Sequence, residues 1–326
     1  MRKVVLASSV AAMSLLGLLS AITGFASSAQ AQVSPRAAAP KDNYLPPRVC
    51  TKVPGTPGEV CRPWKPMDAW TGRPFSVLTT TFPTSTQSPG VVAYAAWIRT
   101  SRTELALYPG YKGPGLTTGV DRGQEMVPPS ARIDLLASFN SGFYEADGAA
   151  GFYAHHTLFF PMIKGLATVV RYTNGKVDIV KWTGGPHPVA AVQMARQNLP
   201  LLVDNSRPTA LSTDNAKWGL TLHGLPAVWR TALGVDPKGN LLYVAAPAQT
   251  ASSMAAIMVR LHAVRAMELD INPEWPIFVT YAAAGAKGPS LFVPNPNQIP
   301  GRFLYPSTKD FFAVFTSSGP GGAQPW

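Results

Sequence analysis

The stretch that decides the fold is residues 166–182, LATVVRYTNGKVDIVKW. Its two halves, residues 166–173 and 176–182, are rich in Val, Ile and aromatic side chains, which favour strands. Asn174 and Gly175 lie between the halves, and both residue types tolerate the positive φ angles of a tight two-residue turn. The stretch therefore predicts an antiparallel β-hairpin.

A second hairpin is predicted further along the chain. The apolar runs at residues 229–235 and 240–246 flank Asp236-Pro237-Lys238-Gly239, a combination typical of turns. Shorter apolar, β-branched or aromatic runs predict strands at residues 91–99, 103–108, 135–139, 199–203 and 267–271. Most of the chain after residue 86 therefore reads as strand.

One segment has the spacing of a helix. In residues 252–266 the apolar side chains recur at helical spacing, at Met254, Ile257, Met258, Leu261 and Val264. Ser252 or Ser253 is expected to cap the helix, which leads directly into the strand carrying Glu268 and Asp270. The pattern predicts an α+β domain, mostly antiparallel β-sheet with a few packed helices.

The N-terminal residues have the order of a secretory signal peptide. Arg2 and Lys3 precede an apolar run at residues 4–26, and Ala29-Gln30-Ala31 follows as a small-x-small cleavage site. We expect residues 1–31 to be removed and the protein to be periplasmic or extracellular. The alternative is an uncleaved anchor on the outer face of the cytoplasmic membrane, because about 20 apolar residues can span a bilayer.

Residues 32–86 are rich in Pro, Ala, Thr and Ser, which is typical of an extended linker. Cys50 and Cys61, the only cysteines, lie in this segment. Two ligands cannot close a structural zinc site, and an exported chain favours a disulfide between them. The remaining residues, 87–326, form the predicted main domain.

The chain is basic, with a formal net charge of +11. The positive residues are scattered, without a run of five or more, and no nucleic-acid-binding motif is present. The charge therefore predicts solubility and a general attraction to an anionic cell envelope, and no nucleic-acid partner.

Three polar segments stand out, although the sequence contains no common nucleophile, Walker or dinucleotide-binding motif. They are SFNSGFY at residues 138–144, WRTALGVD at residues 229–236 and AMELDIN at residues 266–272. Asn140 follows an apolar strand, and Arg230 begins another. Glu268 and Asp270 would share one face of a strand, because side chains alternate.

In this order, with a helix before the third, the segments resemble the phosphodiester glycosidase family, over about residues 91–315. That family has an Asn-Gly-Gly-Phe-like turn, an Arg-x-Ala-x-Gly strand and a strand ending Leu-Asp-Gly-Gly. Here Ser141 replaces the first glycine, and Ile271 and Asn272 replace the last two. Trp275, between two prolines, follows where the family has a Gly/Ser-rich loop, so this loop must have another shape.

The resemblance implies hydrolysis of a sugar-1-phosphodiester in a cell-envelope or extracellular glycan. Arg230 would bind the phosphate through its planar guanidinium. Asp270 would supply the acid/base or charge-stabilising carboxylate, with Glu268 as its partner. Asn140, in the turn that also contains Gly142, would bind sugar hydroxyls.

Other readings of these residues remain open. An arginine that begins a strand often forms a salt bridge, and Asp270 and Asn140 are residue types that often accept backbone hydrogen bonds in turns. Glu268 could pair with Arg265 or face solvent.

Two histidine positions are weaker candidates for substrate binding. His155 and His156 are expected on a strand, where they would point to opposite faces, so that one of them, His156 in our assignment, reaches the cleft. His187 lies in a Pro- and Gly-rich loop that could line the same cleft. No residue spacing is typical of a metal site, and we predict neither a metal nor a cofactor.

A different class of function also fits the sequence. The lost glycines and the Pro-rich segment are consistent with a non-catalytic envelope module that binds a glycan or a protein partner. Survival of ligand binding after substitution of Asp270, without product release, would favour this module over the hydrolase.

Overall fold

The computed structural model describes residues 44–52, 55, 57–72, 75–113, 121–148, 150–219, 221 and 224–317. All of these except Tyr44 belong to the compact unit that begins at Leu45. The predicted signal peptide, residues 1–31, and the start of the predicted Pro-rich segment lie outside these residues. Within them, no helix has both the length and the apolar character needed to cross a membrane.

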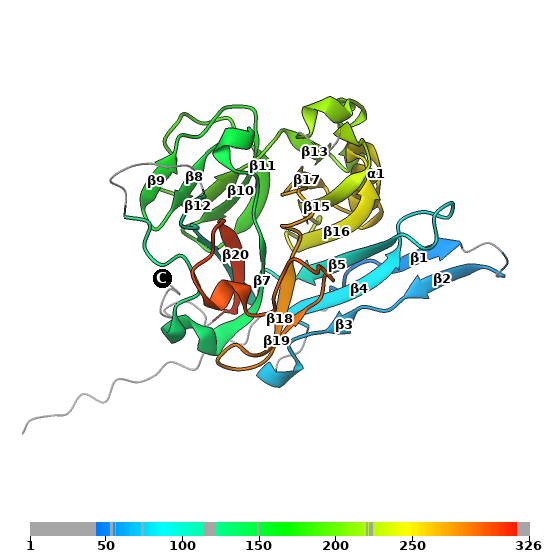
Figure 1. Cartoon of the computed structure of the whole chain (residues 1–326), viewed down its shortest axis with the longest axis horizontal. Coiled ribbons are helices and arrows are strands. Elements are labelled where there is room, and N and C mark those ends of the chain that lie inside the picture. The colour runs from blue at the N-terminus through cyan, green and yellow to red at the C-terminus, as the bar shows by residue number, and fades with distance from the viewer. Residues whose placement is uncertain are drawn as a thin grey trace, which may run out of the picture. The chain divides into compact units, whose positions relative to one another are not determined.

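The largest sheet has eight strands, all paired antiparallel (Figure 1). Its spatial order is β14 (Arg207–Pro208), β13 (Leu201–Asp204), β17 (Arg265–Glu268), β15 (Val228–Val235), β16 (Leu241–Gln249), β5 (Val92–Ile98), β4 (Val77–Pro83) and β3 (Lys65–Pro66).

Two five-stranded antiparallel sheets and a two-stranded sheet complete the β-structure of the described residues. The first runs β11 (Val177–Lys181), β10 (Ala167–Tyr172), β12 (Val192–Gln197), β8 (Phe152–Ala154) and β9 (Thr157–Phe160). The second runs β19 (Lys287–Leu291), β18 (Phe278–Ala283), β7 (Leu135–Asn140), β20 (Phe311–Thr316) and β6 (Thr103–Tyr108). The small sheet pairs β1 (Val49–Lys52) with β2 (Glu59–Arg62).

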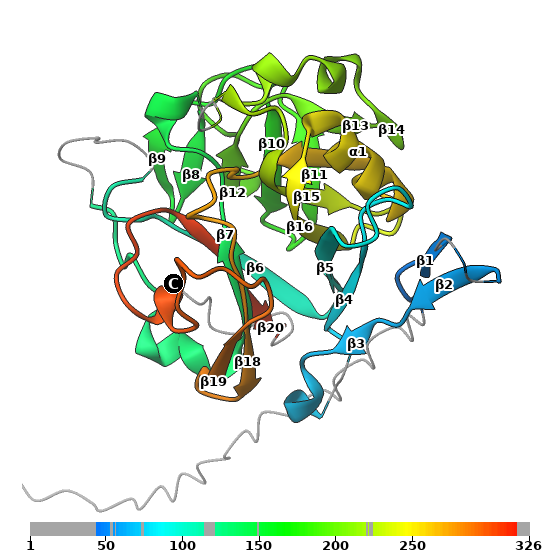
Figure 2. The ribbon, with the colours of Figure 1, turned by 45° about the vertical axis from the view of Figure 1, so that its right-hand side comes forward.

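The described residues contain one α-helix, α1 (Ala251–Arg260), which packs against strands of the eight-stranded sheet (Figure 2). The sequence predicted its position but not its ends. Thr250 caps it, because Thr250 and Ser253 form a reciprocal capping box, and the helix stops at Arg260 because His262 adopts a positive φ of 63°. Short 3-10 helices lie at Ala69–Thr71, Pro129–Asp134, Glu145–Asp147, Ala210–Thr213, Asn215–Lys217 and Arg302–Leu304.

Both predicted hairpins are confirmed. Strands β10 and β11 pair across Asn174-Gly175, where Gly175 has a φ of 83°. Strands β15 and β16 pair across the turn at Asp236, whose Oδ1 accepts hydrogen bonds from the Lys238 and Asn240 amides. The predicted mostly antiparallel α+β fold is confirmed as well.

Part of the Pro-rich segment belongs to the eight-stranded sheet. Strands β3 and β4 precede Gln87, where the sequence placed the start of the main domain, and β4 pairs along its whole length with β5. The run VLTTTFP is β-branched and mostly buried, so it behaves as a sheet strand despite the prolines around it.

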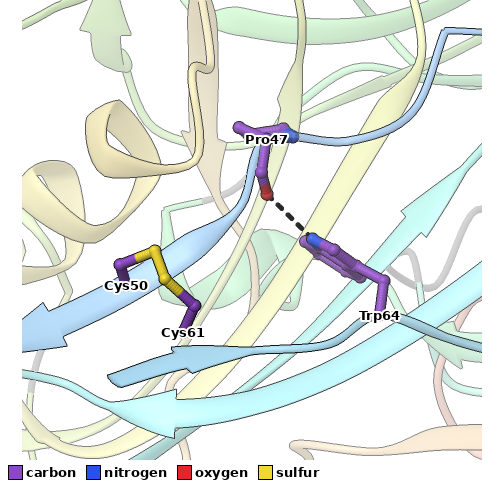
Figure 3. Close-up of a disulfide and its surroundings, with 4 residues drawn as sticks. All are labelled: Pro47, Cys50, Cys61 and Trp64. Carbon is purple, nitrogen blue, oxygen red and sulfur yellow. Dashed lines mark hydrogen bonds between the residues drawn. A yellow bond between two sulfur atoms is a disulfide. The ribbon is translucent and has the colours of Figure 1, made fainter. Parts of the chain in front are cut away.

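The predicted disulfide is present between Cys50 and Cys61 (Figure 3). The two cysteines are directly opposite each other in the β1–β2 hairpin. Trp64 Nε1 donates to the Pro47 carbonyl 2.9 Å away, which ties the two arms of this hairpin together beyond the disulfide. A disulfide of this kind is typical of an oxidising compartment.

An aromatic cluster joins the eight-stranded sheet to the sheet containing β7. The Phe139 ring lies 5.1 Å from Tyr243, 5.6 Å from Phe278 and 5.3 Å from Phe312, measured between ring centroids. All four side chains are fully buried. This packing fixes the end of β7, where Asn140 follows Phe139.

Candidate active site

The three polar segments of the sequence meet at one place. Asn140 ends β7, Arg230 and Thr231 lie in β15, and Glu268 ends the neighbouring strand β17, two residues before Asp270. Thr231 links them, because its hydroxyl donates to the Asp270 carbonyl at 2.7 Å and accepts from Asn140 Nδ2 at 2.9 Å. The three segments are therefore neighbours in the structure.

Arg230 is fully buried, and its guanidinium is occupied by protein groups. It forms an ion pair with Glu268, which is equally buried. It also donates to three oxygens: Gln249 O at 2.9 Å, Trp218 O at 3.2 Å and Asn215 Oδ1 at 3.0 Å. In this conformation, Arg230 stabilises the interior and does not face solvent.

Asn140 has its amide fully engaged. Its Nδ2 donates to Ser141 O and Thr231 Oγ1, and its Oδ1 accepts from Tyr243 Oη at 2.8 Å and from the Ile277 amide at 3.3 Å. These four bonds use the two donors and two lone pairs of an asparagine side chain. The side chain therefore joins β7, β15, β16 and the residue before β18.

Asp270 lies at the meeting point of β17 and the C-terminal segment. One carboxylate oxygen contacts the Lys309 ammonium, and the other accepts the Asn272 amide at 2.9 Å. The Asp270 amide donates to Ser141 O, which fixes Asp270 against the turn after β7. Lys309 reaches this place because it lies two residues before β20, whose first residue, Phe311, pairs with Asn140.

Two aromatic rings surround Lys309. Its Nζ lies 4.2 Å from the centroid of Tyr144 and 5.3 Å from that of Trp275. The two rings are 6.3 Å apart in an edge-to-face arrangement, and on the Trp275 ring the Arg302 guanidinium carbon lies 5.0 Å from the centroid. Tyr144, Trp275 and Arg302 are only partly buried, so this cluster reaches the surface next to Asp270.

A second buried ion pair lies next to the cluster. Arg196 Nε contacts Asp310 Oδ2 at 2.8 Å, and both side chains are almost wholly buried. Arg196 also donates to the carbonyls of Ala150, Gln197 and Phe143. The pair holds the residue next to Lys309 against the turn that carries Tyr144.

Burial dominates the electrostatics of the carboxylates. It raises the pKa of Glu268 to about 8, although Arg230 pulls this value down, and repulsion from Asp270 adds to the rise. Burial also raises the pKa of Asp270, which Lys309 partly offsets. For Tyr144, burial and the nearby Asp310 and Asp270 raise the pKa to about 12. Burial therefore favours the protonated form of both carboxyls, against the opposing pull of Arg230 on Glu268 and of Lys309 on Asp270.

Two of the alternative interpretations of these residues are found in the structure. Arg230 forms a salt bridge, and the Asp270 carboxylate accepts a backbone hydrogen bond. Glu268 does not pair with Arg265, which instead contacts Asp178 at 2.5 Å. Gly142 packs closely on Asn198: a Cβ there would lie 3.1 Å from the Asn198 Cγ, so this glycine allows the turn to approach its neighbour.

The expected strand position of the histidines is wrong. His155 and His156 are the two turn residues between β8 and β9, both with positive φ, so they do not alternate across a sheet. His156 and His187 are both exposed. Among the described residues, no hydrogen bond or ion pair connects either of them with Asp270, Glu268 or Arg230.

A pocket of about 440 Å³ lies at the start of α1, lined by residues that include Thr84, Ser88, Gln249, Thr250 and Arg260. None of the predicted site residues lines it. Within the described part of the chain, no group of three or more His, Cys, Asp or Glu side chains is placed to hold a metal ion.

Comparison with known proteins agrees with the geometry. A model of the phosphodiester glycosidase family matches residues 135–270, from the first residue of β7 to Asp270. Over these residues the chain is similar to the phosphodiester glycosidase family. No protein with a curated description matches the chain.

Two solved structures are similar to this chain. The catalytic domain of zebrafish N-acetylglucosamine-1-phosphodiester alpha-N-acetylglucosaminidase, auto-inhibited by its pro-peptide, has a TM-score of 0.47 and 13% identity, over 79% of this chain and 89% of that chain. A hypothetical protein from Synechocystis has a TM-score of 0.42 and 14% identity, over 82% of this chain and 67% of that chain.

Sequence reasoning missed Lys309, Tyr144 and Arg302 as members of the cluster around Asp270. Lys309 and Asp310 did carry a signal, since two adjacent charges directly precede the apolar run FFAVF. Charges at the start of a buried strand require partners, because an unpaired buried charge is costly. The sequence gives no indication, however, of which distant residues supply those partners.

Proposed function

We propose that this protein is a hydrolase that cleaves a sugar-1-phosphodiester in a cell-envelope or extracellular glycan, with Asp270 as its catalytic carboxylate. One observation carries the proposal. At the position of the family's Leu-Asp motif, the Asp270 carboxylate is held between the Lys309 ammonium and the Asn272 amide, beside a partly exposed aromatic and cationic cluster.

The chemistry follows from this placement. Cleavage of the bond between the anomeric carbon and the phosphate oxygen builds positive charge on the sugar, which an adjacent carboxylate stabilises. The same carboxyl can exchange a proton with the attacking water. Lys309 favours the charged form of Asp270 against the effect of burial, so the two residues together set how readily Asp270 titrates.

Arg230 and Glu268 take part as positioning residues in this proposal. Their ion pair joins β15 to the end of β17, two residues before Asp270. Asn140 positions the turn that contacts the Asp270 amide. These residues therefore act through the backbone around Asp270, and Arg230 does not bind phosphate in the described conformation.

The alternative function is a non-catalytic glycan- or protein-binding module. One observation favours it: the polar groups of Arg230 and Asn140 are engaged by the protein, and Asp270 is only 3% exposed. A module of this kind would bind its ligand at the surface cluster and release no product.

The deciding experiment is turnover by the purified full-length chain against a panel of chromogenic sugar-1-phosphodiesters. We expect turnover in the wild type and a loss of at least about 100-fold in kcat for Asp270→Asn, as for removal of an acid/base group. Asp204→Asn, on β13 and outside the site, is the matched control and should retain activity. Undiminished turnover by Asp270→Asn would exclude Asp270 as the catalytic carboxylate.

We also infer that the protein acts outside the cytoplasm. The Cys50–Cys61 disulfide and the basic, apolar and small-residue order of residues 1–31 support export. Sequencing the N-terminus of protein isolated from an envelope or culture fraction tests this inference: cleavage after Ala31 would leave Gln32 first, whereas an intact N-terminus in the membrane fraction would indicate an anchor.

A further inference from the structure

We propose that Arg302 is the residue that binds the phosphodiester group of the ligand, at a subsite whose wall is formed by Trp275 and Tyr144. This inference rests on the proposed function for the ligand's class, a sugar-1-phosphodiester. It assigns the phosphate to a different arginine from the one that the family motif indicates.

Arg230 is unavailable for the phosphate in this conformation. Its side chain is 0% exposed, and four protein oxygens accept its hydrogen bonds. A phosphate would have to replace the carboxylate of Glu268, which would then be left buried without its cation. Loss of one partner from a buried ion pair is strongly unfavourable.

Arg302, unlike Arg230, has a hydrogen-bond donor that no group in the described part of the chain uses. No acidic side chain pairs with it among the described residues, and its Nη2 is buried without a hydrogen-bond partner. Its guanidinium carbon lies 5.0 Å from the centroid of the Trp275 ring. A guanidinium held against an aromatic ring with an unused N–H can donate a hydrogen bond to a phosphate oxygen, because its planar fork matches phosphate geometry.

The charges around Arg302 favour a monoanion. Lys309 is neutralised by Asp270, and Arg196 is neutralised by Asp310. Arg302 is thus the uncompensated cation of the cluster. A phosphodiester carries one negative charge, which this cation would balance at a partly buried place, where charge-assisted hydrogen bonds are stronger than in water.

Trp275 and Tyr144 supply an apolar wall beside the cation. Both rings are partly exposed, and each also contacts Lys309. A sugar has apolar C–H faces that pack on aromatic rings, so the sugar would lie on this wall while its phosphate faces Arg302. Trp275 stands in the loop where the family motif has Gly and Ser, so the subsite coincides with the main departure from that motif.

Calorimetric titration tests the assignment in the Asp270→Asn/Lys309→Met chain, in which turnover is blocked and Lys309 adds no unpaired charge to the cluster. The probes are methyl phosphodiesters of hexose-1-phosphates, each compared with the matched neutral methyl glycoside. We expect Arg302→Gln to weaken diester binding at least about tenfold, the loss of a charge-assisted hydrogen bond, and to change glycoside binding less than twofold. Trp275→Ala should weaken both. Arg207→Gln, an exposed arginine on β14, is the matched control.

The outcomes separate this inference from the proposed function. Arg302-dependent diester binding without turnover in the wild-type chain would leave the phosphate subsite standing and favour the binding module. Asp270-dependent turnover with diester affinity unchanged by Arg302→Gln, in a variant with the wild-type circular dichroism spectrum, would overturn the subsite alone. Failure of every diester to bind more tightly than its glycoside would overturn it as well.

Discussion

Arg230→Met removes the cation of the most deeply buried ion pair near the site while keeping an unbranched apolar side chain. The substitution removes hydrogen bonds to four protein oxygens, of which Asn215 Oδ1 keeps the Ala251 amide as a donor. At about 1 kcal/mol for each of the other three acceptors, the expected loss in the free energy of unfolding is about 3 kcal/mol. This value agrees with about 3–5 kcal/mol for breaking one half of a buried pair.

A loss of this size is a large part of the about 5–15 kcal/mol by which domains are stable. Urea unfolding at about pH 9, above the pKa of about 8 for Glu268, measures this loss with the ion pair charged. Tryptophan fluorescence follows the transition, and its slope shows whether unfolding stays two-state. The exposed Arg207→Met variant is the matched control and should lie within about 0.5 kcal/mol of wild type.

The double variant Arg230→Met/Glu268→Leu sharpens the test. Since it removes both charges and fills their space with apolar atoms, it should recover part of the lost stability. A loss below about 1 kcal/mol for Arg230→Met alone would refute the conclusion that this guanidinium is buried and hydrogen-bonded to protein oxygens. A double variant less stable than the single one would refute the role of the unpaired Glu268 carboxyl.

Two further predictions follow from buried groups near the site. Because the pKa of Glu268 is about 8 in the folded state against 4.5 for an ordinary glutamate, the native protein holds a proton that the unfolded chain releases. The free energy of unfolding should therefore fall as the pH rises from about 4.5 to about 8, and urea midpoints across this range should fall less steeply for Glu268→Gln. Gly110→Ala would place a Cβ 2.4 Å from the Lys309 carbonyl carbon and 2.5 Å from Thr308 O, so it should displace Lys309 and lower turnover about 100-fold. Gly90→Ala, with open space around it, should be neutral in the same assay, and equal turnover by both variants would contradict the placement of Lys309.

Local patterns predicted much of the fold. Alternation and turn residues identified the β10–β11 and β15–β16 hairpins, because register in a hairpin is set within a few residues. The same local reasoning failed at His155 and His156, where aromatic neighbours suggested a continuous strand. It also missed β4, because the prolines around VLTTTFP obscured a strand that tertiary pairing with β5 stabilises.

The site was predictable only in part, for a similar reason. The motif residues Asn140, Arg230 and Asp270 lie close together as expected, but their hydrogen-bond partners come from remote segments. Nothing local to Asp270 indicates that Lys309 neutralises it. Whether a side chain binds a ligand or stabilises the protein interior depends on such long-range contacts, which a single sequence does not reveal.

The strand order has a consequence for when the protein can fold. Strand β20, from residues 311–316, lies between β7 and β6, and β5 bridges the early strand β4 and the late strand β16. Neither sheet can close until most of the chain has been synthesised, because its inner positions belong to segments far apart in the chain. Such non-local pairing folds slowly, in milliseconds to seconds for small β-domains. The nascent chain would thus stay open for most of its synthesis, a state in which a translocation channel can still accept it.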